Sequence, residues 1–383
     1  MTLPTLCAIV PTRSRTRLAI AAVRSLLDQD CPIEIFVSDN SPTPDRELRD
    51  FCGALFDRRV TYMRPPESLD QAAHWDWAVR EAMRQSAATH FSVHYDRKIS
   101  KPNHLDIAHS VAGGRPGALI CWSHDYVADV PPPMRLWQPA WTGDVFALRT
   151  ARLAELIAQG RAGAIPSYAF PLLSNCLVPR EALTAIVDRF GSLCDSTTPD
   201  SCFAFRFAAL GDEYLYLDRT LGVLYAADRS AGGLYLRAGG GSGFRLAAAP
   251  LPGLNLGLNM LYHEYELVRR ATGGRFAAID RAAYLRDLAA SLPLVGDPGA
   301  REACRRALRA EGWSGRSGQF RQFVRHRLLG ALDRRFGIRL PNVPGRVVRS
   351  DEEALQHALR NPPSRSREAR GLAILQPVKV AAT

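Results

Sequence analysis

The chain has 383 residues, 46% of them hydrophobic and 23% charged, which indicates a folded protein of two domains or of one large domain with an extension. It has no apolar run of the roughly 18 residues that span a bilayer and no signal-peptide pattern, so we expect a cytoplasmic protein. The net charge of +11 favours anionic partners, and the eight cysteines, which form no Cys-x-x-Cys pairs, indicate buried thiols rather than a zinc site or a disulfide framework.

The first forty residues predict a strand–helix–strand unit. An apolar run at Leu6–Val10 predicts a buried strand, apolar positions at helical spacing in Leu18–Leu27 predict a helix, and Ile33–Val37 predicts a second strand. Such a unit forms a right-handed parallel crossover, and in parallel sheets ligands bind outside the carboxyl ends of the strands. Four polar residues lie at the two strand ends: Thr12, Arg13, Arg15 and Asp39.

The residues around these strand ends resemble the start of family 2 glycosyltransferases, whose nucleotide-binding fold is called GT-A. The resemblance rests on Pro11-Thr12-Arg13-Ser14-Arg15 after the first strand and on Val37-Ser38-Asp39-Asn40-Ser41 at the end of the second. It implies that the first turn and the Asp hold the base and ribose of a nucleotide-sugar. The residues that it assigns to donor binding here are Pro11, Thr12, Arg13, Arg15, Asp39 and Ser41. The alternative is an ordinary α/β crossover with a capping Asp.

A loop that starts at Pro65 precedes a helix expected over Leu69–Ala87. The segment Pro66–Asp76 resembles the loop and helix that separate the third and fourth strands in the same family. The resemblance places Ser68 and Asp70 of this loop against the nucleotide. The helix also carries His74, which a structural hydrogen bond in the core explains equally well.

Asp96 follows the next expected strand, His90–Tyr95, and opens a turn that closes at Lys101-Pro102. The resemblance implies an Asp-x-Asp motif here, which in the family binds a divalent metal at the diphosphate. In this sequence Asp96 is present, but Arg97 and Lys98 stand where further carboxylates usually lie. One expectation is a Mg²⁺ or Mn²⁺ ion held by Asp96 and the substrate's phosphates. The other is direct contact of Arg97 or Lys98 with the diphosphate, and the plain alternative is two solvated cations beside a capping Asp.

Further helices and strands are expected along the remainder of the chain. The strands or extended segments are Arg59–Met63, Ala118–Trp122, Tyr168–Val178 and Tyr214–Leu217. The helices are Leu105–Ala112, Ala151–Gln159, Arg180–Phe190, Asp200–Leu210, Asn255–Thr272 and Arg281–Leu292.

Asp200 is the candidate general base. It follows Thr198-Pro199 at the start of an expected helix. The resemblance implies that an acid at this position removes the proton of the acceptor hydroxyl, and burial can tune the pKa of such a carboxyl group. A helix-capping Asp is the alternative, because Thr-Pro-Asp often precedes a helix. Asn175 and Arg206 are assigned to the acceptor side of the same site.

Four segments are expected from the change in composition after Ala227. They are a GT-A domain at 1–227, a helical extension at 228–310, a basic amphipathic helical segment at 311–345 and a disordered tail at 346–383. Within the third segment, Arg316–Leu340 has apolar residues on one side and arginines elsewhere. It is expected either to lie on the inner face of the membrane or to pack on the catalytic domain with a solvated basic side.

We therefore expect an α/β protein with a GT-A, Rossmann-like, mostly parallel sheet flanked by helices, and with a C-terminal helical extension. The resemblance implies inverting transfer of a sugar from a nucleoside-diphosphate-sugar to a glycan or other hydroxyl acceptor, in polysaccharide or glycoconjugate synthesis and without nucleic acid. The alternative is a catalytically inactive relative that binds a nucleotide-sugar or glycan, because the metal motif is incomplete. A nucleotidyltransferase is a third possibility, but it usually needs a glycine-rich basic loop near the first strand, which this sequence lacks.

Overall fold

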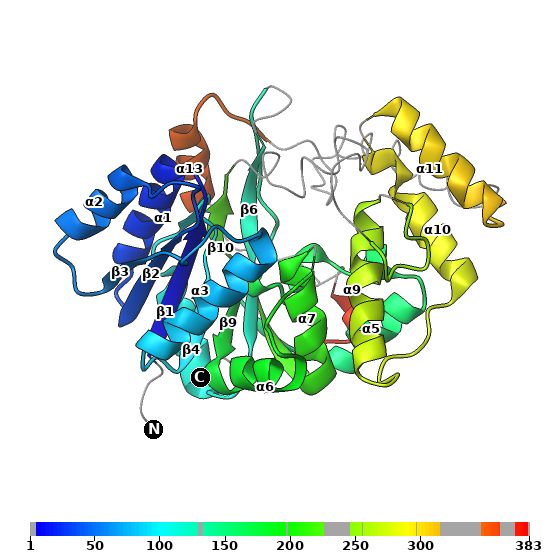
Figure 1. Cartoon of the computed structure of the whole chain (residues 1–383), viewed down its shortest axis with the longest axis horizontal. Coiled ribbons are helices and arrows are strands. Elements are labelled where there is room, and N and C mark those ends of the chain that lie inside the picture. The colour runs from blue at the N-terminus through cyan, green and yellow to red at the C-terminus, as the bar shows by residue number, and fades with distance from the viewer. Residues whose placement is uncertain are drawn as a thin grey trace.

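The structure, a computed structural model, describes residues 5–128, 133–196, 198–225, 246–254, 256–295, 297–314, 346–360 and 372–381. In these ranges helices cover both faces of one sheet (Figure 1). None of the helices in them combines the length and apolarity needed to cross a bilayer. The basic segment Arg316–Leu340 and the glycine-rich loops after Ala227 lie outside the described residues.

The main sheet has the strand order β12-β8-β10-β6-β9-β4-β1-β2-β3. Its strands are β1 (Leu6–Thr12), β2 (Ile33–Asp39), β3 (Val60–Met63), β4 (His90–Val93), β6 (Ile120–Ala128), β8 (Val145–Arg149), β9 (Cys176–Pro179), β10 (Glu213–Leu224) and β12 (Val378–Val380). The strands β3, β2, β1, β4, β6 and β10 run in the same direction, whereas β9 and β8 run against their neighbours. Three short strands pair antiparallel with this sheet or with each other: β5 (Lys98–Ser100), β7 (Arg135–Trp137) and β11 (Arg346–Val347). The expected α/β class with a mostly parallel sheet is confirmed.

Strand β1 shows why helices cover both faces of the sheet. All of its residues are buried, and its side chains alternate between two apolar clusters, with Leu6, Ala8 and Val10 in one and Cys7 and Ile9 in the other. The helices of the first cluster are α1 (Thr16–Leu27), α2 (Arg46–Ala54) and α4 (His104–Gly114). Those of the second include α3 (Gln71–Gln85), α5 (Thr150–Ala158), α6 (Arg180–Phe190) and α7 (Pro199–Leu210).

Helices follow Ala227 as expected, and most of their buried apolar residues belong to the second cluster, whereas Leu246, Ala249 and Met260 form a small cluster of their own. These helices are α9 (Gly257–Ala271), α10 (Arg281–Ser291) and α11 (Pro298–Ala310), which lie to one side of the sheet (Figure 1). The ring of Tyr265 on α9 meets Phe205 of α7 edge-on at 5.7 Å and stacks on Phe276 at 5.1 Å. The extension therefore forms part of the support of α7, the helix that carries Asp200.

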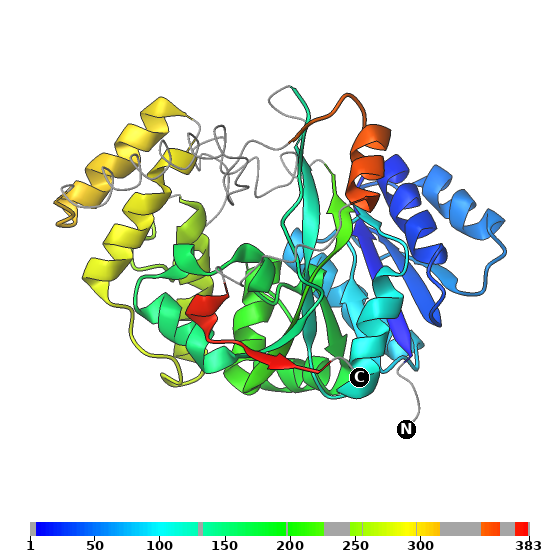
Figure 2. The ribbon, with the colours of Figure 1, turned by 180° about the vertical axis from the view of Figure 1, so that it is seen from behind.

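The expectation of a disordered tail at 346–383 is wrong for the described part of that tail. β11 pairs with β7, α13 (Asp351–Leu359) follows it, and β12 adds to the edge of the sheet beside β8 (Figure 2). Val348, Ala354 and Ala358 are buried against Val127 and Leu136. Leu372 and Leu375, farther along the tail, are buried in the second cluster, so the tail packs against the protein at more than one place.

The turn that follows α5 gives a test of how tightly the extension is packed. A Cβ on Gly160 would lie 2.2 Å from the backbone carbon of Ala283 in α10, whereas a Cβ on Gly191, at the end of α6, would meet open space. Both glycines have positive φ, +63° and +82°. We expect Gly191→Ala to lower the free energy of unfolding by about 1 kcal/mol through backbone strain alone. Gly160→Ala should lower it by about 3 kcal/mol or more, because the added clash is with backbone. Equal losses in urea unfolding would contradict this packing.

Candidate functional site

The strand ends that the sequence singled out meet at one edge of the sheet. Thr12 and Asp39 are register partners at the carboxyl ends of β1 and β2, and Asp96 follows β4 on the other side of β1. Pro11 lies beside Thr12 in the buried end of β1. The hydroxyl of Thr12 donates a hydrogen bond of 2.9 Å to the carboxylate of Asp96. The structure therefore brings these residues together from three strands.

Asp39 is fully buried and its carboxylate is occupied by protein donors. It accepts from the backbone N–H and hydroxyl of Ser41, from the N–H of Asp45 at 3.0 Å, from the hydroxyl of Tyr62 at 2.7 Å and from Arg64 at 3.2 Å. Burial acts to raise the pKa of Asp39, but these hydrogen bonds together lower it below its usual value. A carboxylate offers about four lone-pair positions, so Asp39 has little capacity left for a ligand. Its direct contact with base or ribose stays a prediction, and its visible role is to shape the 41–45 loop.

Asn40 joins the 41–45 loop to the loop before α3. These two loops form two walls of the candidate site. Its side-chain amide donates to the carbonyl of Leu69 at 2.8 Å and accepts from the N–H of Leu69 at 2.9 Å. Arg13 donates to the same carbonyl at 3.3 Å. Ser68 is exposed on this wall, and Asp70 is exposed at the start of α3, where its carboxylate accepts a hydrogen bond of 2.9 Å from the N–H of Ala73. One oxygen of Asp70 therefore serves the helix end, and contact of this residue with the nucleotide stays a prediction.

His74 has the structural role that the sequence left open. Its Nε2 lies 2.8 Å from the hydroxyl of Ser38, and the ring is buried. Burial lowers the pKa of His74 to about 4, so the ring is neutral at physiological pH. Asn40, Tyr62 and Arg64, which build the walls of the site, were not singled out from the sequence. Asn40 and Arg64 directly follow the second and third strands, which is the one signal that points to them.

Asp96 is buried, with 4% of its surface exposed, and Thr12 and Arg15 already hold it. Burial raises the pKa of Asp96 above its usual value, while Arg15, Thr12 and Arg97 act in the opposite direction. The part of the chain that the structure describes contains no group of three His, Cys, Asp or Glu side chains suited to a metal ion. One carboxylate bonded to a hydroxyl and a guanidinium is a poor donor set for Mg²⁺ or Mn²⁺. The residues present therefore do not fit the expected metal on Asp96.

Arg97 lies between the two halves of the site. Its guanidinium stacks over the ring of Tyr95 at 4.8 Å and donates to the carbonyl of Tyr225 at 3.3 Å. The pKa of Arg97 is lowered by burial, and Tyr95, Asp96 and Asp200 act in the opposite direction without cancelling that effect. Both carboxylates therefore lie within electrostatic reach of the guanidinium. The expectation that Arg97 points to solvent is excluded, because only 8% of the residue is exposed.

Lys98 does not face the diphosphate side, and that expectation is wrong. It lies in β5, where its side chain points into the interior and has no exposed surface. Its ammonium donates to the carbonyl of Ser174 at 3.0 Å and lies 5.9 Å from the ring centre of Trp122. Burial lowers the pKa of Lys98 to about 7. The strand alternation of β5 decides this orientation, and the sequence did not reveal β5.

Asp200 lies in the first turn of α7 and reaches the same region from the second half of the domain. Its carboxylate accepts a short hydrogen bond from the hydroxyl of Tyr95 and a bond of 3.0 Å from the N–H of Ser174. The residue is partly exposed, and burial raises the pKa of its carboxyl group above the usual range. Because Tyr95, Asp96 and Arg97 are consecutive, a single short segment links Asp200 to the strand ends of the first half.

The two residues assigned to the acceptor side are bonded to other groups of the protein, so both assignments are corrected. The amide of Asn175 donates to the carbonyls of Trp122 and Phe170, each at 3.2 Å. Arg206 donates to the carbonyl of Ser192 at 2.6 Å and pairs with Asp195. Both side chains satisfy buried backbone or loop groups, so neither is free to hold an acceptor.

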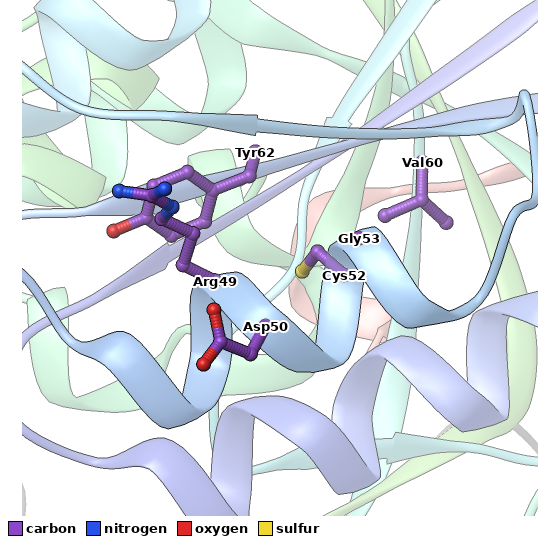
Figure 3. Close-up of a pocket in the computed structure, with 6 residues that line it drawn as sticks. All are labelled: Arg49, Asp50, Cys52, Gly53, Val60 and Tyr62. Carbon is purple, nitrogen blue, oxygen red and sulfur yellow. The ribbon is translucent and has the colours of Figure 1, made fainter.

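A hollow of ≈ 500 Å³ lies at the edge of the sheet, between α2 and β3, and is open to solvent (Figure 3). The residues that line it are Arg49, Asp50, Cys52, Gly53, Val60 and Tyr62. It touches the candidate site only through Tyr62, whose hydroxyl reaches Asp39. Neither Asp96 nor Asp200 is among the residues that line it.

Comparisons with known proteins find similarity to solved structures at low identity and low TM-score. No protein-family model matches the chain, and no curated protein matches it. Among solved structures, S. aureus TarS is 14% identical, with a TM-score of 0.44, over 80% of this chain and 53% of that chain. TarS 1–349 in complex with UDP-GlcNAc is 12% identical, with a TM-score of 0.45, over 80% of this chain and 88% of that chain. The mannosyltransferase PcManGT from Pyrobaculum calidifontis, in complex with GDP-Man and Mn²⁺, is 15% identical, with a TM-score of 0.42, over 88% and 89% of the two chains.

The buried ammonium of Lys98 gives a test of its orientation. Its folded-state pKa of about 7 lies below the unfolded value near 10.5, so the unfolded chain binds more protons between these pH values. The contribution of Lys98 to the free energy of unfolding should therefore rise with pH across this window, by at most about 1.4 kcal/mol per pH unit. Lys98→Met should remove this contribution, so that its pH profile departs from that of the wild type, whereas Lys379→Met, at an exposed lysine of β12, should follow the wild type. Parallel pH profiles for the wild type and Lys98→Met in urea unfolding would show that Lys98 is solvated.

Proposed function

We propose that the protein is an inverting glycosyltransferase that moves a sugar from a nucleoside-diphosphate-sugar to a hydroxyl acceptor. The observation that carries the proposal is that Asp200, which accepts a hydrogen bond from Tyr95, lies within electrostatic reach of Arg97. It places a carboxyl group with a raised pKa beside a cationic region, at the ligand edge of a mostly parallel sheet. Transfer from a diphosphate donor needs both features, one for the acceptor proton and one for the leaving group.

The walls built from the 41–45 loop and from the loop before α3 would receive the nucleoside. Pro11, Thr12 and Ser41 would contact the nucleoside from below, and Arg13 and Ser68 would contact it from the side. Asp39 supports this pocket by holding Ser41, Tyr62 and Arg64 in place. A pocket held by hydrogen bonds before the ligand arrives loses less freedom on binding than a flexible loop would.

In the reaction, Asp200 would accept the proton of the acceptor hydroxyl as its oxygen forms a bond to the anomeric carbon. The bond between that carbon and the diphosphate oxygen breaks on the opposite face, and the electron pair leaves with the nucleoside diphosphate. This single displacement inverts the anomeric centre. Tyr95 and the N–H of Ser174 would hold the carboxylate in orientation, and its raised pKa makes it a stronger base.

A second candidate is a protein that binds nucleotide-sugar or glycan without turnover. The single carboxylate at the expected metal motif favours it. Screening for thermal stabilisation should begin with UDP-GlcNAc and GDP-Man, the nucleotide-sugars bound in the similar structures of TarS 1–349 and PcManGT. Release of nucleoside diphosphate would support the transferase, stabilisation without turnover would support the binder, and release of pyrophosphate would indicate a nucleotidyltransferase.

Asp200→Asn keeps the size of the side chain and removes its proton affinity. It should lower turnover by about 10²–10⁴-fold, which is the usual contribution of a positioned general base. Donor binding, followed by thermal shift, should stay near that of the wild type. Asp188→Asn, at an exposed acid of the neighbouring helix α6, should leave both quantities unchanged. Full transfer activity in Asp200→Asn would exclude Asp200 as the base, and loss of donor binding would instead assign it a structural role.

A further inference from the structure

Asp96 is already neutralised by the protein before any ligand binds. Its two oxygens accept from the hydroxyl of Thr12 at 2.9 Å and from the guanidinium of Arg15 at 3.4 Å, and 4% of the residue is exposed. Arg97 also acts on the pKa of this carboxyl group as a nearby positive charge. A divalent cation placed on Asp96 would have two guanidinium groups as neighbours of like charge.

Arg15 and Arg97 keep most of their hydrogen-bonding capacity. In the described part of the chain, the guanidinium of Arg15 makes one long hydrogen bond, to Asp96, and that of Arg97 makes one, to the carbonyl of Tyr225. A guanidinium has five N–H donors, which match the oxygens of a phosphate in pairs. The Arg15 side chain is 39% exposed and can adjust to a ligand, whereas Arg97 is fixed by its stacking on Tyr95.

The charges at this point suit an anion better than a cation. Arg15 lowers the pKa of Arg97, as a like charge at short range does, so the two guanidinium groups repel each other. Asp96 lies near both, and the pKa of Asp200 is raised by burial, which weakens its contribution as a negative charge. A diphosphate between the guanidinium groups would relieve their repulsion and fill their unused donors.

We propose that Arg15 and Arg97 hold the donor's diphosphate directly, in place of a divalent metal on Asp96. This inference rests on the proposed function and adds how the leaving group is bound. Asp96 then acts as a positioning residue, because it orients Arg15 from the floor of the site. Tyr95 and Tyr225 position Arg97 in the same way.

The test is titration calorimetry of UDP and GDP against the full-length protein, in EDTA and in Mn²⁺. We expect the same affinity in both conditions for whichever nucleotide binds, and no binding of Mn²⁺ alone. Arg15→Gln and Arg97→Gln should each lower the affinity for the nucleoside diphosphate by about 10-fold or more, as the loss of a charge-assisted pair does. Uridine or guanosine, which lack the phosphates, should bind both variants as they bind the wild type. Arg24→Gln, at the far end of α1, is the matched control and should bind like the wild type.

The outcomes separate this inference from the proposed function. Nucleotide binding that EDTA abolishes and Mn²⁺ restores would overturn the inference and leave the transferase proposal standing. Unchanged affinity in both arginine variants would also overturn it. Absence of nucleotide binding under every condition would overturn the proposed function and the inference with it. Thermal unfolding checks that each variant folds, and Arg15→Gln decides the question alone if Arg97→Gln fails to fold, because Arg15 is the exposed member of the pair.

Discussion

The hydrogen bond from Tyr95 to Asp200 is the contact on which the site depends. Tyr95 lies two residues after the end of β4, and Asp200 lies in the first turn of α7, so this bond joins residues 105 positions apart. It orients the carboxylate, and the same ring carries the stacked guanidinium of Arg97. The Tyr95 ring packs in turn against Trp75 of α3 at 5.5 Å. A proton acceptor and a cation are thereby held next to each other by one aromatic side chain, which is itself fixed in the core.

The charged groups of the site fall into two sets. The carboxylates are hydrogen-bonded within the protein, whereas the guanidinium groups keep donors for a ligand. Asp39 accepts hydrogen bonds from four residues and Asp96 from two, so both carboxylates serve to arrange backbone and arginine side chains. Arg15 and Arg97 make one hydrogen bond each in the described residues. A partly buried guanidinium with unused donors is costly in an empty site, and binding of a phosphate offsets that cost.

Helix α13, near the end of the chain, is connected to Arg97 through Tyr225. Tyr225 accepts from the guanidinium of Arg97 through its carbonyl, and its hydroxyl donates to the carbonyl of Asp351 at the start of α13 at 3.1 Å. The N–H of Tyr225 also donates to the carbonyl of Arg97 at 2.8 Å. The docked tail therefore supports the cation that we assign to the diphosphate. Helix α9 and Phe276, which follows it, support α7 in a similar way, through the aromatic contacts of Phe205.

The sequence by itself determined the first β–α–β unit, the strand before Asp96 and the helix that starts at Asp200, because long apolar periodicity and Pro boundaries are local signals. It also placed Thr12, Asp39 and Asp96 at strand ends, which suffices to predict that they meet in a parallel sheet. Tertiary structure decided the rest. The short strand β5 turns Lys98 inward, Asn175 donates to buried carbonyls, and Arg206 donates to the loop at Ser192. The orientation of each of these side chains depends on hydrogen-bonding groups that come from distant parts of the chain. A local sequence pattern does not show which groups those are.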